Sequence, residues 1–121
     1  MRYKNFEDIP IWQEAMDIAI GVHTISEGFP RKEDYGLTSQ VRRSALSVSA
    51  NIAEAFGRHH RLDKLCFYYN VRGSLAETKS HLIYSNRIGY VDSELFKSLE
   101  ERLRIFNINL GKVIASLSKS R

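Results

Sequence analysis

Hydrophobic residues recur along four segments of the chain with the three-to-four-residue spacing of amphipathic α-helices. No stretch of useful length alternates polar and apolar residues as a half-buried β-strand does. Gly28-Phe29-Pro30 follows the first segment, and Gly89 follows the third. The pattern predicts helices over about residues 10–26, 32–59, 63–88 and 93–118.

Each predicted helix carries an apolar stripe, and the connections between the helices are short. The stripe of the last helix includes Leu95, Leu99, Leu103 and Phe106. Asp8 is the candidate N-cap of the first helix. Short connections between long helices favour antiparallel neighbours. We therefore expect residues 1–121 to form one all-α domain, an antiparallel up-down-up-down four-helix bundle.

The second predicted helix also carries a polar stripe with apolar residues on both sides. At about 100° per residue its members fall within an arc of roughly 60°. The third helix offers a polar row, containing Glu77 and His81, beside its own apolar stripe. A polar stripe with two apolar borders is typical of a partly enclosed contact. We expect a register-fixing network, in which Arg43 pairs with Glu54 or Glu77, among Gln40, Arg43, Ser47, Asn51, Glu54, Glu77 and His81. A solvated or ligand-facing stripe is the alternative.

The net charge of +4 is concentrated in the middle of the chain. Residues 31–87 carry ten basic and five acidic side chains, whereas residues 1–30 carry two and five. The sequence pI of about 9.3 favours a nucleic-acid or acidic-protein partner, although a mildly basic enzyme has the same value. The candidate nucleic-acid contacts are Arg42, Arg58, His59, His60, Arg61 and Lys64. Solvated charges at a helix corner are the alternative. No motif for sequence-specific recognition is present, so we expect contacts to backbone and shape.

Enzymatic chemistry has little support in the sequence. A di-iron bundle needs Glu-x-x-His pairs on two helices, and the chain offers only Glu77 and His81, four residues apart. There is no glycine-rich nucleotide loop. The lone Cys66 has no evident orienting group, and we expect it in the core. We therefore expect no enzyme, no metal and no cofactor.

A single cysteine excludes an internal disulfide and suits the cytoplasm, where we expect the protein to act. The first ten residues lack an apolar signal core, and no uncharged run is long enough to cross a bilayer, so we expect no membrane insertion. Phe56, Ile105 and Ile108 project away from the predicted core stripes. They indicate self-association, although isolated exposed apolar residues are also normal.

Several motifs, in order along nearly the whole chain, carry a resemblance to a known family. They are Phe6, Ile11-Trp12-Gln13, Ala15, Phe29-Pro30, Glu33, Tyr35-Gly36-Leu37-Thr38, Gln40, Arg42-Arg43, Ser47, Asn51-Ile52-Ala53-Glu54, Gly57-Arg58, Gly73-Ser74, Glu77 and Gly89-Tyr90. The sequence resembles the four-helix-bundle proteins encoded by 23S ribosomal RNA intervening sequences, which include the accessory variability determinant proteins of diversity-generating retroelements. The chain has Ala55 where the family usually has glycine, and Ser44 where it often has alanine.

The resemblance implies a bundle that assembles into a barrel-like homopentamer, with no known catalysis and with nucleic-acid binding as the favoured role. In the retroelement branch the protein is a strongly basic partner of a reverse transcriptase, and this chain is less basic. We therefore expect a non-enzymatic oligomeric accessory protein that binds RNA or DNA. A structural or protein-interaction scaffold without nucleic-acid binding is the alternative.

Overall fold

The structure is a computed structural model that describes residues 3–119, and in this range it contains four α-helices and no strand. The helices are α1 (Pro10–Ser26), α2 (Leu37–Phe56), α3 (Arg61–Arg87) and α4 (Ser93–Lys119). Two short 3₁₀ helices, Phe6–Asp8 and Arg31–Glu33, precede α1 and α2. The all-α prediction is confirmed, and α1 has the predicted bounds.

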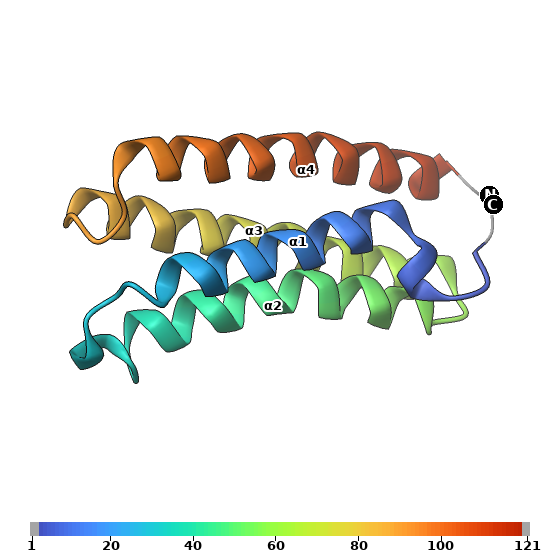
Figure 1. Ribbon diagram of the computed structural model, residues 1–121. Coiled ribbons are helices and arrows are strands. Elements are labelled where there is room, and N and C mark those ends of the chain that lie inside the picture. Colours follow the sequence, from blue (N-terminus) through green and yellow to red (C-terminus); the bar gives the residue numbers. More distant parts are fainter. Residues whose placement is uncertain (1–2, 120–121) are drawn as a thin grey trace.

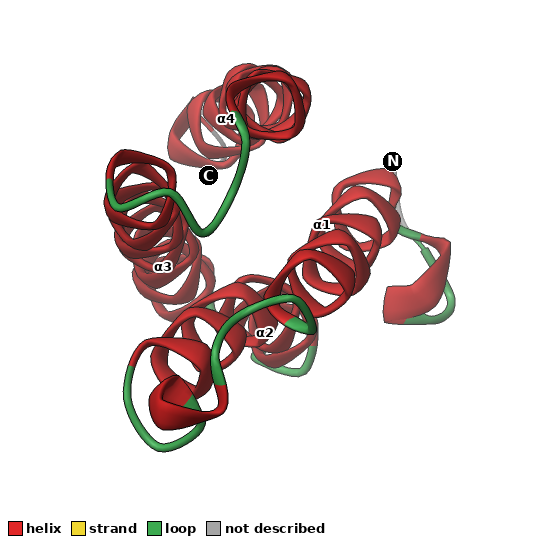
Figure 2. Ribbon diagram, turned by 60° about the vertical axis from the view of Figure 1, so that its left-hand side comes forward, coloured by secondary structure: helices red, strands yellow, loops and turns green. Residues whose placement is uncertain are grey.

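The four helices run up and down along a common long axis (Figure 1). The α2–α3 turn lies at the same end of the bundle as the start of α1 and the end of α4, and the other two connections lie at the opposite end. α2 packs against both α1 and α3, and α4 packs on α3 with a less extensive contact to α1 (Figure 2). This arrangement is an antiparallel four-helix bundle.

The core consists of the apolar stripes of all four helices. Its largest fully buried side chains include Phe106, Ile18, Ile52, Leu82 and Leu110. Burying each such side chain contributes about 1.5–3 kcal/mol to folding. The prediction that Leu95 belongs to this core is wrong, because its side chain is 50% exposed. Leu95 lies in the first turn of α4, where Phe96 packs against the core instead, and Val91 is buried just before the helix.

Three helix boundaries lie more than one residue from the predicted ones, and the N-cap of α1 is a different residue. α2 ends at Phe56 rather than near residue 59, and α3 begins at Arg61 rather than near residue 63. α2 begins at Leu37 and not near residue 32, because Arg31–Glu33 forms a 3₁₀ helix and Gly36 has a non-helical backbone with φ −116° and ψ −112°. The Glu33 carboxylate accepts a hydrogen bond from the Leu37 amide at 3.4 Å. Asp8 lies in the first 3₁₀ helix, so Ile9 and not Asp8 is the N-cap of α1.

The start of α4 agrees with the sequence. The Asp92 carboxylate accepts a hydrogen bond from the Leu95 amide at 2.8 Å, which is the contact of an N-cap residue. Within residues 3–119, no helix combines the length and apolar character that crossing a membrane requires.

Candidate functional site on the α2–α3 face

Small hydroxyl side chains join α2 to α3, and we call this contact the hydroxyl seam: Ser44, Ser47, Ser74 and Thr78. The hydroxyl oxygens of Ser44 and Thr78 lie 2.9 Å apart, as do those of Ser47 and Ser74. Ser44 and Thr78 are 3% and 0% exposed. Both also bond to carbonyl oxygens of their own helices, so the buried hydroxyls are satisfied. The hydroxyl seam holds α2 and α3 in one register at close approach.

The hydroxyl seam replaces the charged network that the sequence predicted. Asn51 extends it by donating to the Ser47 carbonyl oxygen at 2.8 Å. Glu54 pairs with Arg58, just beyond the end of α2, at 3.0 Å, and Glu77 contacts His81 on its own helix at 3.4 Å. Arg43 makes no ion pair with Glu54 or Glu77 in the described range 3–119. The predicted pair does not form because Arg43, like Gln40, projects outward from α2 and is exposed.

The α2–α3 turn brings five of the six predicted nucleic-acid contacts to one end of the bundle, and we call them the corner cluster: Arg58, His59, His60, Arg61 and Lys64. His59 and His60 are exposed, and their ring centroids lie 5.0 Å apart. Arg61 is half-exposed and forms no ion pair within the described residues. These three side chains face solvent without an ionic partner.

The other two cations of the corner cluster are held by the fold. The Arg58 guanidinium lies over the Phe67 ring at 4.7 Å, in addition to its pair with Glu54. The Lys64 ammonium donates to the carbonyl oxygens of Ala55 at 3.0 Å and Phe56 at 3.4 Å. Lys64 therefore caps the end of α2, and its ammonium group is engaged by carbonyl oxygens of the protein.

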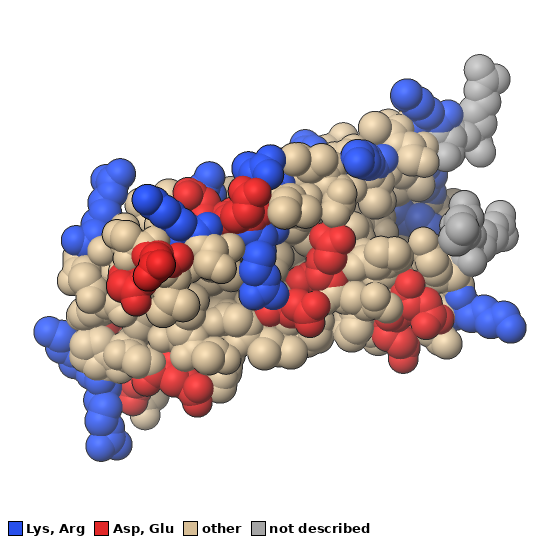
Figure 3. All heavy atoms as spheres, turned by 45° about the horizontal axis from the view of Figure 1, so that its top comes forward, with Lys and Arg blue, Asp and Glu red and all other residues tan. Residues whose placement is uncertain are grey.

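Arg42 lies outside the corner cluster. Its Nε donates to the Ser26 hydroxyl at 2.7 Å, and its Nη2 donates to the His23 carbonyl oxygen at 3.4 Å. Arg42 thus ties α2 to the last turn of α1. Charged side chains of both signs are mixed on the surface. On the face shown in Figure 3, acidic and basic side chains intermingle, and basic side chains project from both ends of the bundle.

A second polar site, which we call the Tyr35 depression, lies near the start of α2 and has a volume of about 380 Å³. It is lined by Tyr35, Ser39, Gln40, Arg43 and Glu77. Tyr35 is fully exposed on the connection before α2. Sequence reasoning gave Gln40, Arg43 and Glu77 a structural role and did not group them with Tyr35. An aromatic residue next to Gly36, just before a helix, was the available signal.

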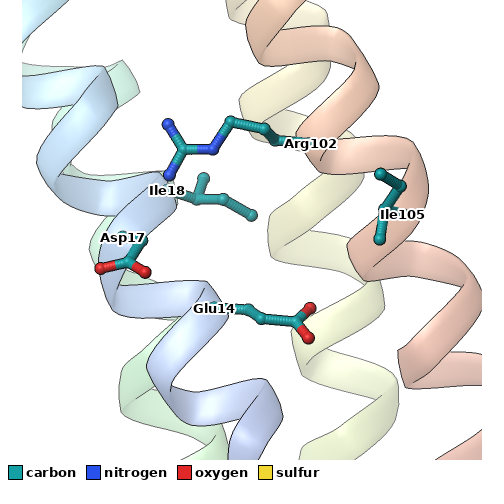
Figure 4. A pocket seen from close by; sticks show the side chains of 5 residues that line it. All are labelled: Glu14, Asp17, Ile18, Arg102 and Ile105. Carbon is teal, nitrogen blue, oxygen red and sulfur yellow. The ribbon is translucent and has the colours of Figure 1, made fainter.

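A smaller groove of about 150 Å³ lies between α1 and α4. Arg102 reaches from α4 toward α1, and Glu14 reaches from α1 toward α4 (Figure 4). The Asn109 amide donates to the Glu14 carboxylate at 3.1 Å. Ile105, on the α4 side of this groove, is 45% exposed. Three of the five residues that line this groove are charged, namely Glu14, Asp17 and Arg102, and the other two are Ile18 and Ile105.

Of the remaining predicted residues, Ile108 and Cys66 are exposed and Phe56 packs inward. Ile108 is 47% exposed on α4, near Ile105. Phe56 instead packs against the protomer's own core, with its ring centroid 6.5 Å from that of Phe6. Cys66 is exposed, so the prediction of a core cysteine is wrong. The reason is that Leu65 and Tyr68 fill the core-facing positions of that helical turn.

Two tyrosines have perturbed acidity, and neither belongs to a catalytic constellation. Burial raises the pKa of the Tyr68 phenol. A hydrogen bond from the Tyr90 phenol to the Glu33 carboxylate, at 2.9 Å, raises the pKa of Tyr90. Across residues 3–119 there is no group of three or more His, Cys, Asp or Glu side chains placed to hold a metal ion.

The fold and the α2–α3 face define an all-α helical-bundle protein with a basic corner and a polar depression. Residues 7–111 match the family model described as 23S rRNA-intervening sequence protein. The chain belongs to this family.

One solved structure supports the fold independently. It is a crystal structure of a protein with unknown function from the S23 ribosomal protein family of Bacteroides thetaiotaomicron. The TM-score is 0.79 at 21% sequence identity, and the match covers 86% of this chain and 97% of the other. No curated protein matches the sequence.

Proposed function

We propose that the protein is a non-enzymatic homo-oligomer that binds RNA or DNA through the corner cluster, as an accessory factor of the 23S ribosomal RNA intervening-sequence family. The observation that carries the proposal is that His59, His60 and Arg61 meet at one turn without an ionic partner. Phosphate contacts supply most of the affinity of sequence-independent nucleic-acid binding. The sequence pI of about 9.3 favours such a partner.

The corner cluster suits a phosphate backbone chemically. The planar Arg61 guanidinium donates paired hydrogen bonds to phosphate oxygens. The two imidazoles add positive charge when they are protonated. Arg58 is fixed over Phe67 and supplies a positive charge that does not have to be ordered on binding.

Assembly amplifies this charge. In the homopentamer that the resemblance implies, five copies of the corner cluster repeat around the ring, and each chain contributes a formal charge of +4. The exposed side chains of Ile105 and Ile108 on α4 supply apolar surface for the contacts between copies.

Fluorescence anisotropy with a structured RNA hairpin and a single-stranded DNA, titrated across salt concentrations, tests the proposal. We expect saturable binding whose log affinity falls by about 0.7–0.9 per phosphate contact for each tenfold rise in salt. Replacing Arg58 and Arg61 by Ala is expected to weaken binding about tenfold and to lower the salt slope by about 1–2.

A matched control removes two cations from the other end of the bundle, by Arg87→Ala with Lys97→Ala. Both side chains are exposed and without an ion pair within residues 3–119. We expect this variant to bind within about twofold of the wild type. An absence of binding at low salt, or equal losses in the two double variants, would contradict the proposal and favour the scaffold alternative.

A further inference from the structure

The Tyr35 depression contains hydrogen-bonding groups that the fold leaves unused. Ser39, Gln40 and Arg43 make no side-chain hydrogen bond and no ion pair within the described residues. Arg42, on the same helix, and Arg58, just beyond its C-terminal end, are both engaged by the protein. An arginine without a partner beside a polar hollow is available to an anionic group of a ligand.

The walls of the depression are held in place by the contacts beneath and beside them. The Ser44–Thr78 contact of 2.9 Å fixes α2 against α3 directly under Arg43 and Glu77. The Glu33 carboxylate joins the connection before α2 to both the Leu37 amide and the Tyr90 phenol, at 3.4 and 2.9 Å. The backbone that carries these side chains is therefore preorganised, which reduces the entropy lost when a ligand binds.

The three outer side chains differ in chemistry and define the ligand. Tyr35, fully exposed, offers an unobstructed ring face on which a planar base stacks. Arg43 presents a fork that matches phosphate oxygens. Glu77 lies on the wall formed by α3, has a 60% exposed side chain, and contacts only His81 at 3.4 Å. An ionised carboxylate only accepts hydrogen bonds, so it selects a ligand edge that donates them.

We propose that the Tyr35 depression binds a single guanine nucleotide, with the base on Tyr35, the phosphate on Arg43 and the base edge toward Glu77. Guanine is the base that presents two adjacent donors, N1–H and N2–H₂, to one carboxylate. The same chemistry is offered by a free nucleotide and by an unpaired guanosine in an RNA strand, whose bases are recognised by stacking and by their Watson–Crick edges.

This site is separate from the corner cluster. Arg43 of the depression and Arg58 of the corner cluster are 15 positions apart in the sequence, which places the two sites roughly 20 Å apart along α2. Nucleotide binding here does not require that the corner cluster binds phosphate backbone. The two proposals therefore fail or succeed independently.

Isothermal titration calorimetry with guanosine monophosphate tests the proposal, with adenosine monophosphate, guanosine and inorganic phosphate as comparisons. We expect saturable binding of guanosine monophosphate and weaker binding of the other three. Arg43→Gln is expected to weaken binding at least about tenfold, a loss typical of one charged hydrogen-bonded contact. Glu77→Gln is expected to reduce the preference for guanine over adenine.

Three controls keep the result interpretable. Tyr35→Phe keeps the aromatic ring and is expected to bind the nucleotide as the wild type does. Tyr35→Ala removes the ring and is expected to bind it more weakly. Tyr69→Ala removes an exposed aromatic ring elsewhere on α3 and leaves binding unchanged. Arg87→Ala removes an exposed cation outside both sites and is also expected to leave nucleotide binding unchanged. Circular dichroism and thermal melting verify that each variant is folded.

A second arm distinguishes the source of the nucleotide. RNA hairpins with one bulged guanosine or one bulged adenosine are compared in the Arg61→Ala background, which suppresses binding at the corner cluster. Arg43-dependent preference for the bulged guanosine, with or without binding of the free nucleotide, supports the proposal. No binding of either ligand at millimolar concentration, or binding that Arg43→Gln leaves intact, overturns it.

Discussion

Lys64 shows how a side chain of one helix completes the end of another. α2 stops at Phe56, and its last carbonyl groups need partners. The Lys64 ammonium supplies them from the first turn of α3, at 3.0 and 3.4 Å. A cation at this end also opposes the negative pole of the helix dipole. One residue therefore links the end of α2 to the start of α3.

Lys64→Met is expected to lower the free energy of unfolding by about 1 kcal/mol, because the side chain keeps its length and loses the charged donor. Urea unfolding followed by circular dichroism measures the change. Lys97→Met, an exposed lysine without an ion pair within residues 3–119, is the matched control and should change stability little. Equal effects in the two variants would remove the capping role of Lys64.

Tyr68 makes stability depend on alkaline pH. Burial raises the pKa of its phenol above the ordinary value of 10.0, so the folded state prefers the neutral form. The unfolded chain releases this proton at the ordinary pKa. The contribution of Tyr68 is therefore complete below pH 10 and declines as pH rises above it.

We expect Tyr68→Phe to lose less stability than the wild type between neutral pH and about pH 11. Urea unfolding at a series of pH values measures this difference. Tyr69→Phe is the control, because Tyr69 is 50% exposed. If the free energies of unfolding of the wild type and Tyr68→Phe decline in parallel as pH rises, ionisation of the Tyr68 phenol does not control alkaline stability.

The sequence identified the basic residues but not the protein groups that bind them. Arg42 and Lys64 look like free surface cations in the sequence, yet both bind carbonyl or hydroxyl oxygens of the protein. The partner of Arg42 is Ser26, sixteen residues earlier. Such pairings depend on how α1 and α2 pack, and no local pattern encodes them. Arg43, expected inside a network, lies instead at the polar depression.

At the scale of elements, the sequence predicted a polar contact between α2 and α3, but it predicted charged side chains there and the structure has hydroxyl groups. The polar stripe of α2 and the polar row of α3 do meet at Ser47 and Ser74, whereas the buried Ser44–Thr78 contact lies outside both predicted rows. Neutral hydroxyls bury at lower cost than charged groups do. Helical projection gives the direction of each side chain but not how far it extends between helices, so it did not separate the small residues from the charged ones.

Ser44→Leu is expected to lower the free energy of unfolding by about 1–3 kcal/mol, because a large side chain does not fit the close α2–α3 contact. Chemical denaturation measures the loss. Ser80→Leu makes the same change at an exposed site on α3 and should have a small effect. Similar stabilities for the two variants would mean that the hydroxyl seam is not closely packed.

At the scale of the whole molecule, the helix count and the antiparallel order followed from periodicity and short connections. The bounds of α2 did not, because Gly36 and the Arg31–Glu33 turn delay its start. Hydrophobic periodicity continues through such a turn and does not mark it.

Light scattering after size-exclusion chromatography tests the proposed assembly. We expect a particle of five times the chain mass of 14.0 kDa. Ile108→Glu is expected to reduce this mass, because it places a charge in an apolar contact. Leu62→Glu, at a residue that is 68% exposed on α3, is the control and should leave it unchanged. A monomeric wild type would contradict the assembly.

The most direct test of the central claim locates the bound nucleic acid on the protein. The His59, His60 and Arg61 amides have no backbone hydrogen-bond partner in the described structure, so they exchange hydrogen rapidly when the protein is free. Hydrogen–deuterium exchange is measured with and without a saturating RNA hairpin at low salt. The account predicts slowed exchange in peptides that cover residues 57–65. Unchanged exchange in these peptides, with protection confined to other surfaces or absent, would contradict it.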